Sequence, residues 1–540
     1  MTRPDKGDME KRLIIAIALS VLIIVTFQAL APKPPAAPPP VAVSTDTAPA
    51  VADKAAVISA PLPQETAVEE KELEAATDKF IVVFSNIRGA VKSMLLKEYK
   101  DSATGVPMVL ASIKNPREFV GSISSGSIAG LDTSAYLSER SADQVLYRLR
   151  SGDLEISKRY FLHKSKHGID LEISIKNMSS SPKAVSYRLV GGSGVGESNP
   201  QDKRFVEVTS KINGKITGFT RPKNKRIISP GIVEWITLKN KYFSIILKPF
   251  TATKDQFYSE DSDGQLTMGL DTIEFIIPPG EAISNKYVFY FGPNHIPVLK
   301  DFGHGLEETV DYGFFGGISK FMLSVMRFFY AIVRSWGLSI ILLSIFLNIV
   351  LFPLTIKSFK SMQKMQELHP QMDKLKKQYK DNPQKLNKEM MELYKTYKVN
   401  PFGGCLPILL QMPILIALYA ALMRSLELRG ARFLWIRDLS SPDALQIPVT
   451  LPLIGNSINI LPLIMVVAMV VQQKISTKSM GSAVTSEQQE QQKIMLIVMP
   501  VVFGFVFYSM PSGLVLYWIV NTLLTVAEQG FMLKNTASKA

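Results

Sequence analysis

The sequence predicts a multi-domain membrane protein in which an all-β domain precedes a polytopic α-helical core. Two runs without any charged residue, Trp336–Ile356 and Cys405–Met423, predict the core. At 1.5 Å per residue the first run spans roughly 31 Å, enough to cross a bilayer. The strict alternation of apolar and polar residues in Ile169–Lys176 predicts a half-buried strand in the preceding domain.

The segment between the two uncharged runs is strongly basic. It carries eleven Lys, no Arg and five acidic residues. An excess of positive charge in a short loop marks the cytoplasmic side of a membrane. The sequence therefore predicts that this segment lies in the cytoplasm, beneath a membrane-embedded core.

Composition excludes several classes of function. The chain has 540 residues and a net charge of +14, which is compatible with nucleic acid or an anionic membrane as a partner. Because much of the excess Lys flanks apolar runs, membrane topology explains it, and sequence-specific nucleic-acid binding is not predicted. The single cysteine, Cys405, excludes an internal disulfide and a Cys-based zinc site. We predict no metal site, no cofactor and no enzymatic activity.

The N-terminal region is interpreted as a short cytoplasmic segment, 1–12, followed by a transmembrane anchor, 13–30. A cleaved secretory signal is the alternative, since Ala29-Leu30-Ala31 resembles a cleavage site. The apolar run is longer than the usual signal core and Pro32 follows it directly, which favours a retained anchor with a cytoplasmic N-terminus. Residues 31–78, Pro/Ala-rich and then acidic, are predicted to form an extended linker.

Residues 79–317 are predicted to form an antiparallel β-sandwich on the periplasmic side. Short apolar runs separated by turn residues, without interleaved helices, indicate this class. Besides Ile169–Lys176 they are Phe80–Phe84, Ile232–Leu238, Tyr242–Leu247, Ile273–Ile277 and Lys286–Phe291. The glycine-rich Gly191–Gly196 lacks the Gly-Lys-Ser/Thr ending of a phosphate-binding loop and is interpreted as a plain turn.

Residues 318–335 are predicted to form an amphipathic helix. Its apolar residues recur at helical spacing, and Lys320, Ser324 and Arg327 lie off that face. Two interpretations remain open: the helix lies in the outer membrane interface, or it packs against the β domain.

The sequence contains further apolar runs after Met423, which predict a core of residues 336–532. Together with the anchor, this gives six spans with both termini in the cytoplasm. The predicted core segments are a span 336–357, a cytoplasmic helical hairpin 358–400, a span 405–424, a periplasmic loop 425–457, a span 458–472, a cytoplasmic loop 473–493, and spans 494–510 and 513–532, before a cytoplasmic tail 533–540. The apolar runs within the last three spans, Ile458–Val471, Ile494–Tyr508 and Leu514–Val526, are short against the ~20 residues normally needed, which indicates local thinning of the bilayer.

The hairpin is predicted to consist of two helical arms with a turn at Asp381-Asn382-Pro383. Its apolar residues can simply bury a seam between the arms. The soft thioethers of its methionines can also contact varied apolar segments, and the two interpretations are compatible. The methionines selected as candidate contacts are Met362, Met365, Met372, Met390 and Met391.

Polar residues inside the predicted spans form the candidate substrate site. They are Ser344, Asn348, Gln411, Tyr517, Trp518 and Asn521. Such residues serve either as hydrogen-bonding glue between helices or as the lining of a hydrophilic groove. The middle of each core span contains no Asp, Glu, Lys or Arg, which argues against a proton-coupled pump or an ion pathway.

Several motifs in order resemble the YidC/Oxa/Alb family of membrane protein insertases, over Gly337 to about Gln529. They are Val399-Asn400-Pro401-Phe402-Gly403-Gly404-Cys405-Leu406-Pro407, Gln411-Met412-Pro413-Ile414, Leu434-Trp435-Ile436-Arg437-Asp438-Leu439 and Pro511-Ser512-Gly513-Leu514-Val515-Leu516-Tyr517-Trp518. The anchor and the large β domain resemble the Gram-negative form of the family.

The resemblance implies a five-helix bundle enclosing a hydrophilic groove, open to cytoplasm and lipid, and a periplasmic β-supersandwich. It implies an inner-membrane location and, as partners, nascent membrane proteins, the Sec translocon with its accessory proteins, the ribosome and signal-recognition machinery, and the lipid bilayer. Ser344, Gln411 and Trp518 fall where the family's groove-lining residues lie. Asn348 stands where the family commonly has an Arg, so attraction of acidic substrate segments is not implied here.

Two other classes of function are weighed against an insertase. A solute transporter predicts internal repeats, broken helices and ionisable groups at the midplane, none of which the sequence shows convincingly. A membrane-anchored carbohydrate-binding or carbohydrate-active protein would act through paired carboxylates in the β domain, and the sequence indicates no such pair.

Overall fold

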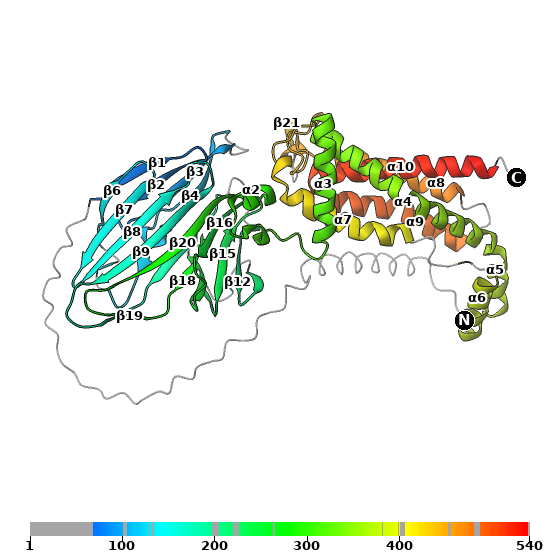
Figure 1. The fold of residues 1–540 in the computed structure, drawn as a ribbon. Helices are drawn as coiled ribbons and strands as arrows, with labels where there is room; N and C mark the ends of the chain where they lie inside the picture. Colours follow the sequence, from blue (N-terminus) through cyan, green and yellow to red (C-terminus); the bar gives the residue numbers. More distant parts are fainter. Residues whose placement is uncertain are drawn as a thin grey trace, which may run out of the picture.

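The computed structural model describes residues 69–537 except for 101–104, 129, 132–133, 197–204, 220–225, 263–264, 381, 398, 400–405, 452–454 and 480–485. The predicted N-terminal segment 1–12, the anchor 13–30, residues 31–68 of the predicted linker and residues 538–540 lie outside the described residues. The described chain forms a β domain followed by a helical bundle, with the β domain beside one end of the bundle (Figure 1).

Two antiparallel sheets dominate the β domain, as the alternating runs predict. The larger sheet has the order β13-β12-β15-β16-β20-β9-β8-β7-β6 and the smaller β14-β17-β18-β11-β5. The strands of the larger sheet are β6 Leu137–Arg140, β7 Gln144–Ser151, β8 Leu154–Leu162, β9 Gly168–Asn177, β12 Glu207–Ile212, β13 Lys215–Phe219, β15 Val233–Lys239, β16 Phe243–Pro249 and β20 Ala282–Pro293. Those of the smaller sheet are β5 Ile123–Ser124, β11 Arg188–Ser193, β14 Arg226–Pro230, β17 Gln256–Ser262 and β18 Gln265–Asp271.

The two sheets pack face to face around one apolar core. Strand β11 of the smaller sheet contacts β15 and β16 of the larger one. Ile245, Leu247 and Met268 are fully buried between them. Strand β9 alternates between buried and half-buried residues, as predicted for Ile169–Lys176. An all-β sandwich domain is therefore confirmed.

The interpretation of Gly191–Gly196 as a plain turn is wrong for its first half. Gly191 and Gly192 belong to β11, which carries a bulge between Val190 and Gly192. A Cβ on Gly191 would lie 2.7 Å from Leu247 Cδ2 of the facing sheet. The glycines therefore allow the two sheets to approach closely at the bulge.

The acidic end of the predicted linker is part of the β domain. Strand β1, Glu72–Ala76, pairs with β2, Phe80–Ser85, in a third sheet of order β1-β2-β3-β4, completed by β3 Ala90–Lys100 and β4 Pro107–Ser112. The prediction of an extended linker through residue 78 is thus wrong at its end. The composition of this stretch is acidic, but its alternate residues Leu73 and Ala75 turn toward the covered face of the sheet.

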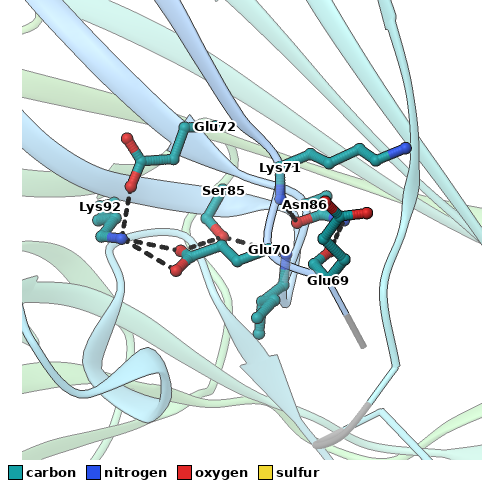
Figure 2. A network of polar contacts seen from close by, with 8 residues as sticks. Glu69, Glu70, Lys71, Glu72, Ser85, Asn86 and Lys92 are labelled. Atoms are coloured by element: carbon teal, nitrogen blue, oxygen red, sulfur yellow. Dashed lines mark hydrogen bonds and ion pairs between the residues drawn. The ribbon is translucent and has the colours of Figure 1, made fainter. Parts of the chain in front are cut away.

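Charged and polar groups fix this strand, as Figure 2 shows. Lys92 Nζ lies 3.0 Å from Glu70 Oε2 and 2.6 Å from Glu72 Oε1, and Ser85 Oγ donates to Glu70 Oε1 over 2.8 Å. The Lys71 backbone N–H donates to Asn86 Oδ1 over 2.7 Å. The cation of β3 offsets the repulsion between the two glutamates, so the acidic run can enter the sheet.

Short elements join the β domain to the bundle. They are helix α2 Ile296–Phe302 and the 3-10 helix η3 Leu306–Thr309, which follow β20. The 3-10 helix η1 Pro116–Glu118 and the paired strands β10 Lys183–Val185 and β19 Phe275–Ile277 belong to the β domain itself. Helix α3, Gly316–Val333, follows η3 and runs across the end of the bundle, at a steep angle to the other helices (Figure 1).

Helix α3 packs on the bundle with one side and exposes the other. Ser319 Oγ donates to the carbonyl of Ala417 in the bundle over 2.8 Å, and Met322 and Met326 are buried. Phe321 and Phe328 are exposed. The predicted apolar face is therefore divided between the bundle and the exterior, because its apolar arc is wider than the contact with the bundle.

The bundle contains five long helices within the described residues. They are α4 Trp336–Glu367, α7 Leu406–Arg424, α8 Ile460–Ser479, α9 Ser486–Phe507 and α10 Ser512–Ala537. By length and composition, α3, α4 and α10 contain stretches long and apolar enough to cross a membrane, while the apolar parts of α7, α8 and α9 are shorter. A polytopic α-helical core is confirmed. The helices are longer than the apolar runs because their polar ends continue the same backbone hydrogen bonding.

The hairpin departs from its predicted form at its first arm. Helix α4 continues without a break from the predicted span to Glu367, and the arm is completed by α5, His369–Gln378. The second arm is α6, Pro383–Thr396, whose N-cap Asn382 accepts a hydrogen bond from the Lys385 N–H. The hairpin lies at the end of the bundle away from the β domain (Figure 1).

The loop between α7 and α8 is structured. It contains the 3-10 helix η5 Leu426–Leu428 and a β-hairpin of β21 Leu445–Leu451 and β22 Gly455–Ile458. Ser512 Oγ donates to the Asp438 carbonyl over 3.0 Å, and the Gly513 N–H donates to the Leu439 carbonyl over 2.9 Å. These contacts hold the loop on the N-terminal end of α10.

Candidate functional site in the helical bundle

A line of polar residues runs along one face of α10. Tyr517, Asn521 and Thr525 are separated by four residues each and so lie above one another on the helix. Thr525 Oγ1 donates to the Asn521 carbonyl over 2.8 Å. The three positions cover about 12 Å along the helix axis. We call these three residues the polar stripe of α10.

The middle of the stripe is hydrogen-bonded to α4. Asn348 Nδ2 donates to Asn521 Oδ1 over 2.8 Å and to the Ser344 carbonyl over 2.9 Å. Both asparagines are half-buried. Asn348 Oδ1 and Asn521 Nδ2 have no hydrogen-bond partner within the part of the chain that the structure describes. The pair therefore keeps one free acceptor and free donors.

The end of the stripe nearer the N-terminus of α10 is hydrogen-bonded to α7. Gln411 Nε2 donates to Tyr517 OH over 2.6 Å. Tyr517 is fully buried and Gln411 is half-buried. Since α10 receives hydrogen bonds from α4 and from α7, it is the element that brings the predicted polar residues together.

Two of the predicted site residues occupy packed positions. Ser344 is fully buried and its hydroxyl donates to the Ile340 carbonyl of its own helix over 2.8 Å. Trp518 is half-buried and packs its ring against Phe503 and Phe507 of α9, with centroids 5.6 and 5.3 Å away. The Ser344 hydroxyl is thus bonded within α4, one turn before Asn348. The ring of Trp518 joins α10 to α9.

Apolar packing closes the bundle at the end nearest the β domain. Gly513 and the residues after it lie under the loop between α7 and α8. The residues buried there are Ile340, Leu343, Leu418, Ala421, Leu422, Leu514 and Val515. The polar stripe therefore begins below an apolar plug and continues toward the end that carries the hairpin.

The hairpin methionines divide into two groups. Met365, Met372 and Met390 are half-buried, and Tyr394 OH of α6 lies 3.9 Å from Met372 Sδ of α5. Met391 is exposed over 56% of its surface. Met362 lies in α4, but its side chain is outside the described part. The half-buried methionines suit a seam between the arms, and the exposed thioether of Met391 suits contact with another chain.

Sequence reasoning missed a polar junction at the end of the bundle nearest the β domain. Glu427, in η5, lies 2.7 Å from Arg327 Nη2 of α3, and its Oε1 lies 3.1 Å from His295 Nε2 beside α2. Lys241 of the β domain donates to the Ser440 carbonyl over 3.1 Å, and Tyr242 OH donates to Ser440 Oγ over 2.9 Å. The only local sign of this junction in the sequence was the acidic Glu427 between Arg424 and Arg429, in the loop between α7 and α8.

The polar stripe and the residues hydrogen-bonded to it carry neutral amides and hydroxyls. They supply amide donors and acceptors inside an apolar bundle, which suits transient hydrogen bonding to another polar chain. Two regions of the chain match the models of known protein families. Residues 72–325 match the family model described as the YidC periplasmic domain, and residues 328–539 match that of the 60Kd inner membrane protein.

Relatives match the whole chain. Membrane protein insertase YidC of Geotalea uraniireducens (strain Rf4) is 33% identical over 558 residues, covering 98% of this chain and 100% of the relative. That of Geotalea daltonii is 32% identical over 555 residues, covering 98% and 99%. The chain belongs to the YidC family of membrane protein insertases. A solved structure of an active YidC insertase, with its first transmembrane domain resolved, is 18% identical, covers 85% of this chain and 92% of that one, and has a TM-score of 0.36.

Each of the two parts of the molecule corresponds to a known region of the YidC family. The β domain corresponds to the YidC periplasmic domain, whose match begins at residue 72, where β1 begins. The bundle belongs to the 60Kd inner membrane protein region. As a YidC-family chain, this is a membrane protein insertase and not an enzyme, which sets aside both the transporter and the carbohydrate-active protein.

Proposed function

We propose that the polar stripe of α10, with Asn348 and Gln411 facing it, is the surface along which polar segments of incoming membrane proteins pass. The observation that carries this proposal is the pair of interhelical hydrogen bonds, Asn348 to Asn521 and Gln411 to Tyr517, below the apolar plug. Ser344 and Trp518 shape the neighbouring helices. The unpaired amide atoms of Asn348 and Asn521 bind a polar group of the client.

The physical reason is the cost of polar groups in hydrocarbon. A charged residue at the centre of a membrane helix costs roughly 2.5–3.5 kcal/mol on the insertion scale. Hydrogen-bonding groups in the bundle lower that cost for part of the path. The short apolar parts of α7, α8 and α9 support a thinned bilayer around the bundle, which shortens the rest. Burial of the client's apolar segment in lipid then drives its release.

We also propose the orientation and the partners. With the β domain in the periplasm, the hairpin at the far end of the bundle lies in the cytoplasm, and six spans place both termini there. The inner membrane is the location that fits the family. On this basis the hairpin, through Met391 and neighbouring residues, first contacts nascent chains near the ribosome and the signal-recognition machinery. Docking to the Sec translocon is a second mode of action.

The test is insertion of a small single-spanning client into liposomes that contain only this purified chain. Protease protection reports translocation of the client's polar tail. We expect insertion by the wild type, and a roughly tenfold slower rate for Asn348→Leu and for Gln411→Leu, because each removes a polar group from the path.

Neighbouring residues provide matched controls. Ile349 and Met412 are exposed and directly follow Asn348 and Gln411 in the chain, so Ile349→Leu and Met412→Leu should insert the client like the wild type. Equal rates for all four variants would exclude the stripe as the path. Insertion only after addition of the Sec translocon would replace autonomous insertion with an assisting role.

A further inference from the structure

A cavity of about 320 Å³ lies between the β domain and α7. It is separate from the polar stripe, because its α7 wall comes from the last two turns of that helix, toward Arg424. The residues that line it are Phe205, Glu207, Lys239, Asn240, Lys241, Asn294, Thr309, Val310, Asp311, Ile416, Tyr419, Ala420, Met423 and Arg424.

The two walls of the cavity differ in chemistry. The α7 wall presents Ile416, Tyr419 and Ala420, and Ile416 is exposed over 46% of its surface. The β-domain wall presents Lys239 and Glu207. An apolar wall that faces a polar, charged wall suits a ligand that is itself amphipathic.

The lining carries an excess of one positive charge, since three cations face two carboxylates. Lys239 is already paired: its Nζ lies 3.2 Å from Glu207 Oε1 and donates to the Thr309 carbonyl over 2.9 Å. Arg424 makes no side-chain hydrogen bond or ion pair with any residue that the structure describes. Burial lowers the pKa of Lys239, and the nearby charge of Arg424 lowers it further. An anion beside Arg424 would relieve this repulsion.

The position of the cavity along α7 indicates where the ligand comes from. Arg424 ends α7, and Ile416 lies two turns earlier, roughly 12 Å deeper. In the proposed orientation α7 crosses the membrane with Arg424 at the outer interface, where a guanidinium meets lipid headgroups. Ile416 is then at the depth of the acyl chains.

We propose that this cavity binds the phosphodiester headgroup of a phospholipid from the outer leaflet, with the phosphate beside Arg424 and the upper acyl chains against Ile416, Tyr419 and Ala420. The monoanionic phosphodiester balances the excess positive charge of the lining. The bound lipid contacts both α7 and the β domain. It therefore holds the β domain on the end of the bundle at which Arg424 lies. This inference depends on the proposed orientation of α7 but not on the polar stripe as a client path.

The experiment measures lipid retention by the full chain, independently of insertion. The purified protein in detergent is titrated with a short-chain phosphatidylglycerol, and bound lipid is counted by native mass spectrometry. Arg424→Gln should weaken binding roughly tenfold, because it removes a charge-assisted contact to the phosphate. Ala420→Phe should weaken it as well, because it fills the apolar wall.

The matched control is Arg432→Gln, since Arg432 is exposed in the same outer loop and does not line the cavity. It should bind lipid like the wild type. Equal binding by Arg424→Gln and Arg432→Gln would overturn the proposal, even if Ala420→Phe were misfolded. Inorganic phosphate that competes as strongly as the lipid would overturn the assignment to a phospholipid.

Discussion

Arg327 of α3 and Glu427 of η5 form a double contact, with Arg327 Nε 2.8 Å and Nη2 2.7 Å from Glu427 Oε1. His295, at the start of α2, approaches the same oxygen to 3.1 Å. One carboxylate therefore joins the end of the β domain, the helix across the bundle and the loop after α7. The side chain of Glu427 is mostly buried, which makes these contacts stronger than surface ion pairs.

We predict that Glu427→Gln destabilises the junction by about 2 kcal/mol, because it leaves Arg327 and His295 without their anion. Burial alone would raise the pKa of Glu427, but the hydrogen bond from His295 and the charge of Arg327 outweigh it and lower the pKa well below its usual range. The contribution to stability is therefore complete above about pH 4.5 and is lost as the pH falls below that value.

Thermal unfolding of the full chain in detergent, at pH 7 and at stepwise lower pH, measures this effect. Glu281 is exposed and outside the junction, so Glu281→Gln serves as the control. If Glu427→Gln and Glu281→Gln unfold alike at pH 7, the junction contributes no stability.

The hydrogen bond between Asn348 and Asn521 predicts coupling between two positions far apart in sequence. In a double-mutant cycle with Asn348→Leu and Asn521→Leu we expect a coupling free energy of about 0.6 kcal/mol, the usual value between membrane helices. Unfolding in mixed micelles measures it. Strict additivity of the two changes would show that the pair does not interact.

Replacement of Asn348 with arginine tests what the neutral amide cannot do. Asn348→Arg places a cation beside Asn521, and we expect it to speed insertion of clients with acidic tails while slowing those with basic tails. The ratio of the two rates in liposomes is the measurement, with raised salt reducing the difference if charge is the cause. A uniform change for both clients would point to altered packing instead.

The contact between Gln411 and Tyr517 predicts an asymmetric response. Gln411→Leu leaves the buried Tyr517 hydroxyl without a partner and should cost about 1–3 kcal/mol. Tyr517→Phe removes that hydroxyl, and the half-buried Gln411 can turn to another partner, so its cost should stay below about 1 kcal/mol. Thermal unfolding compares the two variants, and the opposite order would contradict the buried position of the tyrosine.

His167 makes the β domain sensitive to mild acid. It is buried beside Tyr99 and Tyr290, and burial lowers the pKa of His167 to about 4 from 6.5. Between these values the unfolded chain binds more protons, so stability falls as the pH drops from 6.5 to 4, by up to about 3 kcal/mol. In His167→Gln this part of the pH dependence should disappear. Proteolysis of the full chain at graded urea concentrations, followed at β8 and β9, measures it, and an unchanged pH profile would exclude His167 as its source.

The sequence by itself determined those features that depend on neighbours along the chain. Alternation predicted β9, and uncharged runs predicted α4 and α7. The residue types of the site, such as Asn348 and Gln411, were also recognisable, because amides are conspicuous in an apolar run. These patterns record local geometry, with a period of two in strands and a continuous apolar surface in spans.

Only the tertiary structure decided which of these residues meet. Asn348 and Asn521 are separated by 173 positions, and the partner of each depends on where α4 crosses α10. The same holds for Glu427, whose partners come from two other segments, and for β1, which is acidic in composition yet pairs with β2. No local periodicity encodes such pairings, because they arise when packing of the whole chain brings distant backbones to hydrogen-bonding distance.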